Sequence, residues 1–83
     1  MPVSHYAFRL LPLHEQLATV FTEGTFLMTR WEEESAINLY WLTGQFFAEV
    51  YYDEVGNLLY QVQAFTSMAC LADYLCYVRL PGM

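Results

Sequence analysis

The stretch QFFAEVYYDEVGNLLYQVQAF, residues 45–65, decides the fold of this chain. Its two arms, residues 45–52 and 58–65, are rich in aromatic, aliphatic and β-branched side chains, which favour strands. Between the arms, Asp53 can cap a turn through its carboxylate, and Gly56 can supply the left-handed residue of a turn that ends in a bulge. The pattern therefore predicts an antiparallel hairpin closed by a short loop.

Two further strands precede this hairpin. Residues 25–31 (TFLMTRW) and residues 36–43 (AINLYWLT) have the same aromatic and β-branched character. The polar residues 32–35 (EEES) separate these two strands, and Gly44 ends the second one. Because every connection is short, strands that are neighbours in the sequence should pair, so we expect an antiparallel meander of four strands.

A helix is predicted before the sheet, over residues 12–22. Pro12 suits the first helical position, where its missing N–H leaves no hydrogen bond unmade. The apolar side chains at helical spacing are Leu13, Leu17, Val20 and Phe21. They form one stripe that can face a sheet, and Gly24 is expected to cap the helix at its C-terminus. Residues 1–10 alternate well enough for a short strand but could equally form an arm.

A second helix is predicted after the sheet, over residues 68–78. Thr66 and Ser67 offer a hydroxyl cap ahead of it, and a Pro-Gly pair stops it. At α-helical spacing, the stripe that faces the sheet consists of Met68, Leu71, Ala72, Leu75 and Val78, with Asp73 nearly opposite. We therefore expect a single α+β domain over residues 1–83: a four-stranded antiparallel β-meander flanked by an N-terminal and a C-terminal helix, in the order α-β-β-β-β-α.

Alternation along the strands decides which side chains share a face of the sheet. One face is expected to hold Phe46, Ala48, Val50, Tyr52, Ile37, Leu39, Trp41, Tyr60, Val62 and Ala64. The opposite face is expected to hold Phe47, Glu49, Tyr51, Leu59, Gln61, Gln63, Phe65, Asn38, Tyr40 and Leu42. With both helices on the first face, the second exposes a wide aromatic patch, and such patches usually mark an interface or a ligand groove. With one helix on each face, the same side chains belong to an ordinary core.

The composition of the 83 residues excludes several classes of protein. Hydrophobic residues make up 57% and charged residues only 14%, which excludes a disordered chain. Three arginines (Arg9, Arg30 and Arg79) stand against nine acidic residues, and the net charge is −6. We therefore expect no nucleic-acid binding and no attraction to an anionic membrane, because both require clustered cations. Without an apolar run of about 18 residues or a cationic leader, the expected location is the cytoplasm.

No motif of catalysis or of cofactor binding is found in the sequence. The four glycines stand at the ends of predicted elements, so none forms a phosphate-binding loop. The spacing of His5 and His14 matches no metal-binding pattern, and the carboxylates of residues 32–34 point in different directions, as in a solvated turn. Cys70 and Cys76 lie about 9 Å apart along the axis of the predicted helix, which is too far for a disulfide. The sequence predicts reduced thiols, no cofactor, no metal and no enzyme active site.

Two functions remain open. The first is a small acidic protein that self-associates as a homodimer, or binds another protein, through the second face of the sheet, which a small core favours. Its expected interface consists of Tyr40, Leu42, Phe47, Tyr51, Leu59 and Phe65. The second is a small-molecule-binding module, because aromatic walls with a few polar groups are typical of ligand sites. Its expected pocket is lined by Trp31, Asn38, Trp41 and Gln61.

Overall fold

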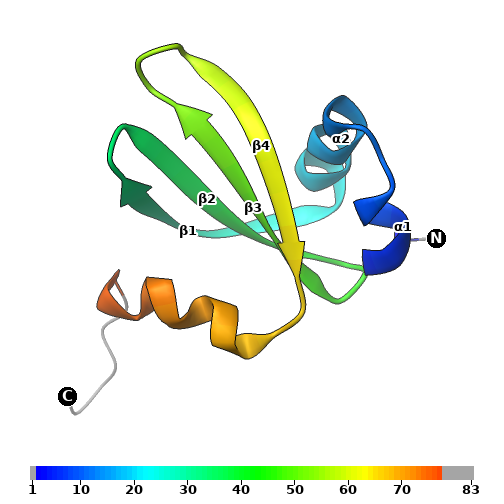
Figure 1. The fold of residues 1–83 in the computed structure, drawn as a ribbon. Helices are drawn as coiled ribbons and strands as arrows, with labels where there is room; N and C mark the ends of the chain where they lie inside the picture. The colour runs from blue at the N-terminus through cyan, green and yellow to red at the C-terminus, as the bar shows by residue number, and fades with distance from the viewer. Residues whose placement is uncertain (1, 78–83) are drawn as a thin grey trace.

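The computed structural model describes residues 2–77, apart from the side chains at positions 70, 73 and 75–77. In chain order the elements are α1 (His5–Arg9), α2 (Leu13–Glu23), β1 (Gly24–Glu32), β2 (Ser35–Leu42), β3 (Phe46–Asp53), β4 (Leu58–Phe65) and the 3₁₀ helix η1 (Met68–Tyr77) (Figure 1). The strands form one antiparallel sheet in the order β1-β2-β3-β4. The predicted α+β class and antiparallel meander are confirmed. No helix among the described residues is both long and apolar enough to cross a membrane.

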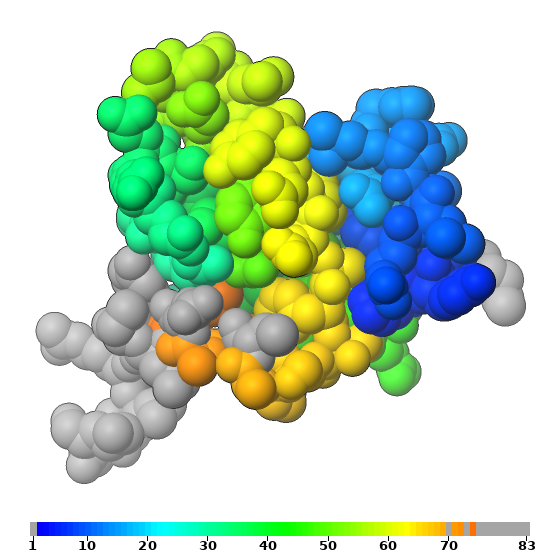
Figure 2. Space-filling model, viewed as in Figure 1, coloured from blue at the N-terminus to red at the C-terminus, as the bar shows by residue number. Residues whose placement is uncertain are grey.

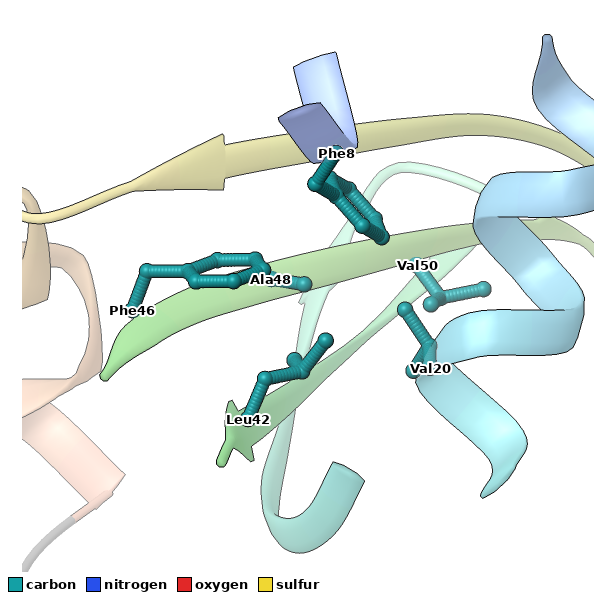
Figure 3. Packing of buried hydrophobic residues seen from close by; sticks show 6 residues of the cluster. All are labelled: Phe8, Val20, Leu42, Phe46, Ala48 and Val50. Atoms are coloured by element: carbon teal, nitrogen blue, oxygen red, sulfur yellow. The ribbon is translucent and has the colours of Figure 1, made fainter. Parts of the chain in front are cut away.

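The sheet has a helical layer on each of its faces. The helices α1 and α2 lie on one side, called the α face below, and η1 lies on the other side, called the η face (Figure 1). The core of the α face consists of Phe8, Val20, Leu42, Phe46, Ala48 and Val50 (Figure 3). The core of the η face consists of Leu39, Phe65 and Tyr74, against which Met28, Phe47 and Leu71 pack. Of the two arrangements left open by the sequence, the structure has the one with helices on both faces.

The predicted hairpin is present as β3 and β4, with Asp53 paired with Leu58 at its closed end. The Asp53 carboxylate caps the loop, since its Oδ1 atom accepts a 3.0 Å hydrogen bond from the backbone N–H of Val55. The left-handed residue is Asn57, at φ 52°, and not Gly56 as the sequence predicted. Asparagine tolerates this conformation better than most residues because its short polar side chain hydrogen-bonds locally.

The turn between β2 and β3 overturns part of the predicted face assignment. Residues 43–45 form this turn, with Gln45 in the left-handed conformation at φ 67°. A three-residue turn pairs Leu42 with Phe46. Even-numbered residues of both strands therefore share one face, and odd-numbered residues share the other. Asn38, Tyr40 and Leu42 therefore lie on the α face with Phe46, Ala48 and Val50, while Ile37, Leu39 and Trp41 lie on the η face with Phe47, Glu49 and Tyr51.

A bulge in β4 changes the predicted faces of two more residues. Tyr51 pairs with Gln61, but Tyr52 pairs with Leu59, so Tyr60 is an extra residue in the ladder. Leu59 consequently lies on the α face, and Tyr60 turns to the η face beside Tyr51. The prediction had placed both the other way round, because strict alternation has no room for an inserted residue.

The first ten residues contain a short helix, where the sequence left a strand or an arm open. Ser4 is the N-cap of α1, and its Oγ accepts a 3.1 Å hydrogen bond from the backbone N–H of Ala7. Phe8 is fully buried, and its ring centroid lies 5.1 Å from that of Phe46. Because a single buried side chain holds this helix on the α face, the sequence contains no apolar stripe that would predict it.

The helix predicted over residues 12–22 is present as α2, with small differences at both ends. Pro12 is the N-cap and not the first helical residue. Gly24 has an extended conformation (φ −91°, ψ 149°), so the helix passes directly into β1 without a left-handed cap. Glycine is required there for another reason: a Cβ atom at Gly24 would lie 2.5 Å from the carbonyl oxygen of Val20.

The predicted C-terminal α-helix is not seen, and η1 occupies most of its place. A 3₁₀ helix has three residues per turn, so Leu71 and Tyr74, three positions apart, both face the sheet. Met68 and Ala72 were predicted to face the sheet but are exposed. Val78 lies outside the described residues, as do the side chains of Cys70, Asp73, Leu75 and Cys76.

Candidate functional site

The η face has a covered part beneath η1 and an open part at the ends of the two hairpins. The hairpin ends of β1–β2 and β3–β4 lie at the opposite end of the sheet from α1 (Figure 1). Figure 2 shows that the hairpin ends and the α1–α2 layer form separate bulges of the surface, with β4 between them. The polar side chains of the η face gather where the covered part meets the open part.

A buried polar cluster joins η1 to the sheet. Arg30 of β1 and Glu49 of β3 are each 7% exposed, and Tyr74 of η1 is 2% exposed. Glu49 accepts a 3.1 Å hydrogen bond from the Arg30 guanidinium and a 2.6 Å hydrogen bond from the Tyr74 hydroxyl. The guanidinium also lies over the Tyr74 ring, 5.2 Å from its centroid. These contacts compensate the burial of both charges.

The electrostatics of this cluster keep Tyr74 neutral and Arg30 charged. Burial, together with the hydrogen bond to Glu49, raises the pKa of Tyr74 well above its usual range, so the phenol stays neutral and donates. Burial alone would lower the pKa of Arg30, but hydrogen bonds with Glu32, Tyr74 and Glu49 outweigh it and raise the pKa. The cluster is therefore suited to holding η1 on the sheet.

Next to the cluster, the hairpin ends enclose a cavity of about 370 Å³. We call it the hairpin cavity; its lining residues are Glu32, Glu33, Ser35, Ile37, Tyr51 and Tyr60. All four strands contribute residues to this lining, and so does the turn that follows β1. Ile37 lies beneath the cavity and is fully buried, whereas Tyr60 is 41% exposed at the rim.

Two tyrosine rings form one wall of the hairpin cavity. The ring centroids of Tyr51 and Tyr60 lie 5.9 Å apart, with the ring planes inclined by 60°. The bulge in β4 makes this contact possible, because it turns Tyr60 to the η face. The Tyr60 hydroxyl is hydrogen-bonded to Ser35 Oγ at 2.9 Å. Burial raises the pKa of Tyr51, and the nearby Glu49 carboxylate raises it further, so this phenol also stays neutral.

Carboxylates outnumber cations around the hairpin cavity. Glu32 and Glu33 line it, and Glu49 lies close enough to affect Tyr51. Arg30 forms ion pairs with both Glu32 and Glu49. Among the described residues, one guanidinium charge therefore stands against three carboxylates, and these charges give the cavity a negative potential.

A second, larger cavity of about 560 Å³ runs along the outer edge of β4. Its lining combines residues 61–67 with His5, Arg9 and Gln16 from the two α-helices. It is a shallow groove with mostly amide and hydroxyl groups and without paired aromatic rings, so it has fewer features of a ligand site than the hairpin cavity.

Four large apolar side chains, each about half exposed, lie on or next to β1, which is an edge strand. This β1-edge patch consists of Phe21, Phe26, Leu27 and Trp31. The rings of Phe21 and Phe26 each contact Tyr40, at centroid distances of 6.1 and 5.7 Å. Leu27 is the extra residue of a bulge, since the register between β1 and β2 shifts from Phe26 to Met28.

The six residues of the predicted interface do not share one face. Tyr40, Leu42 and Leu59 lie on the α face, and Leu42 is fully buried there. Phe47 and Phe65 lie on the η face, with ring centroids 5.3 Å apart, and belong to the core beneath η1. Tyr51 alone of the six lines the hairpin cavity. The second sheet face is thus covered by η1 where the interface was expected.

The four residues of the predicted pocket are likewise divided between the faces. Trp31 and Asn38 lie on the α face, where Asn38 accepts a 2.6 Å hydrogen bond from Thr29. Trp41 and Gln61 lie on the η face, and the Trp41 ring packs against Phe47. The structure does not bring the four together; Asn38 and Trp41, three positions apart in β2, point to opposite faces because side chains alternate along a strand.

Sequence reasoning missed most of the hairpin cavity. Of its lining residues, only Tyr51 was a predicted site residue, and the carboxylates of residues 32–34 were interpreted as a solvated turn. The signal in the sequence was a tyrosine near the closed end of each strand of the β3–β4 hairpin, Tyr51 and Tyr60. The bulge that brings Tyr51 and Tyr60 together has no signature in the sequence.

Comparison of the chain with protein-family models, with curated proteins and with solved structures found no match. Among the described side chains, no three from His, Cys, Asp or Glu gather closely enough to hold a metal ion. The chemistry of the hairpin cavity itself is therefore the basis for a functional proposal.

Proposed function

We propose that the chain is a small, acidic, non-enzymatic binding protein that holds a small molecule in the hairpin cavity. The observation that carries this proposal is the pair of tyrosine rings, Tyr51 and Tyr60, that form one wall of the cavity. The volume of about 370 Å³ falls within the range of about 300–1,000 Å³ that is typical of ligand sites. A rigid aromatic wall and a few polar groups are what such sites use for affinity and orientation.

The environment of Glu49 supports a binding function over a catalytic one. Among the described residues this is the buried carboxylate nearest to the hairpin cavity, and a general base would need it free to accept a proton. Both Arg30 and Tyr74 donate hydrogen bonds to its Oε2 atom. The carboxylate is therefore committed to the contact between η1 and the sheet.

The proposal is tested by an NMR screen of small polar and aromatic fragments against the protein. Fragments that bind in the hairpin cavity are expected to shift the ring resonances of Tyr51 and Tyr60 in a saturable manner. Tyr60→Leu should weaken these fragments, whereas Tyr6→Leu, the same change on the exposed surface of α1, should not. Fragments that bind but leave both rings unaffected would contradict the proposal, and so would a screen without any binder.

A second candidate function is self-association as a homodimer through the β1-edge patch. Its support is the position of four half-exposed apolar side chains beside an open edge of the sheet. An edge strand has unpaired backbone groups that a second copy can extend, and side chains of this kind add apolar area to the contact. The test is the oligomeric state of the wild type compared with that of variants carrying a charge in the patch.

We also propose a cytoplasmic location. The chain has two cysteines, six positions apart, and the sequence predicts that they do not pair. Small secreted domains usually depend on several disulfides for stability, whereas cytoplasmic proteins keep their thiols reduced. A non-reducing mass measurement that finds both thiols free supports this location, and a disulfide-linked form would contradict it.

A further inference from the structure

We propose that the molecule held in the hairpin cavity is a small organic cation with an alkylated ammonium group. This inference rests on the binding function proposed above and names the chemical class of the ligand. It follows from the combination of two tyrosine rings and, among the described residues, an excess of carboxylates in one cavity.

The two rings provide the aromatic part of the site. Tyr51 and Tyr60 meet at 60° with their centroids 5.9 Å apart, so a group in the cavity contacts both rings. A cation within about 6 Å of a ring centroid is attracted by the negative potential of the aromatic face. Burial raises the pKa of Tyr51 above its ordinary value of about 10, so its phenol stays neutral at physiological pH. It therefore acts as an aromatic wall and not as a charged ligand.

The charges select a cation over an anion or a neutral molecule. Glu32 and Glu33 line the cavity, and the single guanidinium of Arg30 is already shared between Glu32 and Glu49. Among the described residues, no arginine forms an ion pair with Glu33. A bound cation would complete the charge balance, whereas an anion would meet unfavourable potential on entering.

The remaining lining selects an alkylated cation over a metal ion. The hydroxyl groups of Tyr60 and Ser35 are hydrogen-bonded to each other, which leaves them less able to coordinate a bare ion. The faces of aromatic rings suit methyl groups but not a hydration shell. An ammonium group with methyl substituents matches the rings and the carboxylates together.

The test uses choline as the probe and 3,3-dimethyl-1-butanol as its uncharged isostere. Both are titrated into the wild-type protein while the ring resonances of Tyr51 and Tyr60 are followed by NMR. Choline is expected to bind saturably, and the isostere at least about tenfold more weakly, since it lacks the cation–π and Coulomb interactions. Equal affinity for the two compounds would overturn the inference.

Variants then separate the roles of the ring and of the carboxylate. Tyr60→Leu is expected to weaken choline binding about threefold or more, whereas Tyr60→Phe, which keeps the aromatic face, should retain it. Glu33→Gln should weaken choline by a similar factor. Glu54→Gln makes the same charge change in the exposed β3–β4 loop, outside the cavity, and should have no effect. Choline affinity that is unchanged in both Tyr60→Leu and Glu33→Gln would overturn the inference.

Failure of this inference can be told apart from failure of the proposed function. If the fragment screen yields neutral compounds that shift Tyr51 and Tyr60 but choline does not bind, the cation assignment is wrong and the binding function stands. If no compound of any charge binds in the cavity, both fail. A trimethyllysine peptide that binds more than about tenfold tighter than choline would instead identify a protein partner and overturn the assignment to a small molecule.

Discussion

The Tyr74 hydroxyl of η1 donates a 2.6 Å hydrogen bond to Glu49 Oε2, the same oxygen that accepts a hydrogen bond from Arg30. This oxygen therefore joins a helix and two strands, β1 and β3, at one point. Because all three side chains are buried, water cannot replace a lost partner. The contact between Tyr74 and Glu49 is thus the main polar link between η1 and the sheet among the described residues.

The first prediction concerns the strength of this link. Tyr74→Phe removes the donor but keeps the ring, and we expect it to lower the free energy of unfolding by about 1.5–3 kcal/mol, since the acceptor is a buried charge. Tyr60→Phe removes a hydroxyl whose partner, Ser35, lies near the surface, and it should cost less than about 1 kcal/mol. Urea denaturation of the three proteins measures both effects. Equal stability of wild type and Tyr74→Phe would contradict the role of this link.

The second prediction concerns alkaline pH. The pKa of Tyr74 is raised in the folded protein, so above about pH 10 the unfolded chain loses the phenol proton before the folded one does. The contribution of Tyr74 to stability is therefore fully present below about pH 10 and declines as the pH rises above it, by up to about 1.4 kcal/mol per pH unit. Tyr74→Phe lacks this contribution and should show a shallower decline. Urea denaturation between neutral and alkaline pH compares the two slopes, and identical slopes would show that Tyr74 is not protected.

The fold class could be predicted from the sequence because its signals are local. The aromatic and β-branched arms around Asp53 and Gly56 predict one hairpin, and the short connections leave little choice of topology. The helix ending before Gly24 follows from apolar residues at helical spacing. These features depend on neighbours in the chain, so no knowledge of distant contacts is needed.

The faces of the sheet could not be predicted because single residues decide them. The turn that contains the left-handed residue Gln45 decides which side chains of β2 and β3 share a face. The extra residue Tyr60 moves the side chains at the start of β4 to the opposite faces from those that alternation predicts. A shift of one residue moves every side chain of a strand to the other face. The lining of the hairpin cavity depends on both irregularities, because the turn puts Ser35 and Ile37 on the face of Tyr51 and the bulge adds Tyr60, so no periodicity in the sequence could reveal it.

The third prediction tests the helix α1, which the sequence did not predict. Phe8 is its one buried residue and packs against Phe46, so Phe8→Ala should leave a cavity and cost about 3–5 kcal/mol of stability. Tyr6→Ala, two positions away on the exposed side of the same helix, should change stability by less than about 0.5 kcal/mol. Thermal denaturation of both variants provides the comparison. Equal, small effects would mean that α1 does not pack on the sheet in solution.

The fourth prediction is that the protein does not bind nucleic acid. Of the two arginines in the described part of the chain, Arg30 is buried in ion pairs, and only Arg9 is exposed. Affinity for nucleic acid depends on the number of phosphates that cations can neutralise, and Arg9, even together with Arg79 of the sequence, neutralises very few. Electrophoretic mobility of duplex and single-stranded DNA should be unchanged by the protein at about 0.15 M salt. A retarded band would show that the electrostatic argument is wrong.

The last prediction concerns self-association through the β1-edge patch. Phe26 is about half exposed beside the open edge of β1, so Phe26→Glu should place an unpaired charge in any apolar contact between two copies. In a symmetric dimer the change occurs twice, and we expect the dimer to dissociate into folded monomers. Val55→Glu adds the same charge at the exposed tip of the β3–β4 hairpin and controls for net charge.

Sedimentation velocity over a range of concentrations gives the oligomeric state, and circular dichroism shows whether each variant folds. Trp31 provides a further signal, because its half-exposed indole should become less accessible to water when the dimer forms, so its emission should change on dilution. A wild type that stays monomeric at the highest concentration would contradict self-association. A dimer that survives Phe26→Glu would place the contact elsewhere, because a charge buried without a partner on both sides of the interface costs more than the apolar contact contributes.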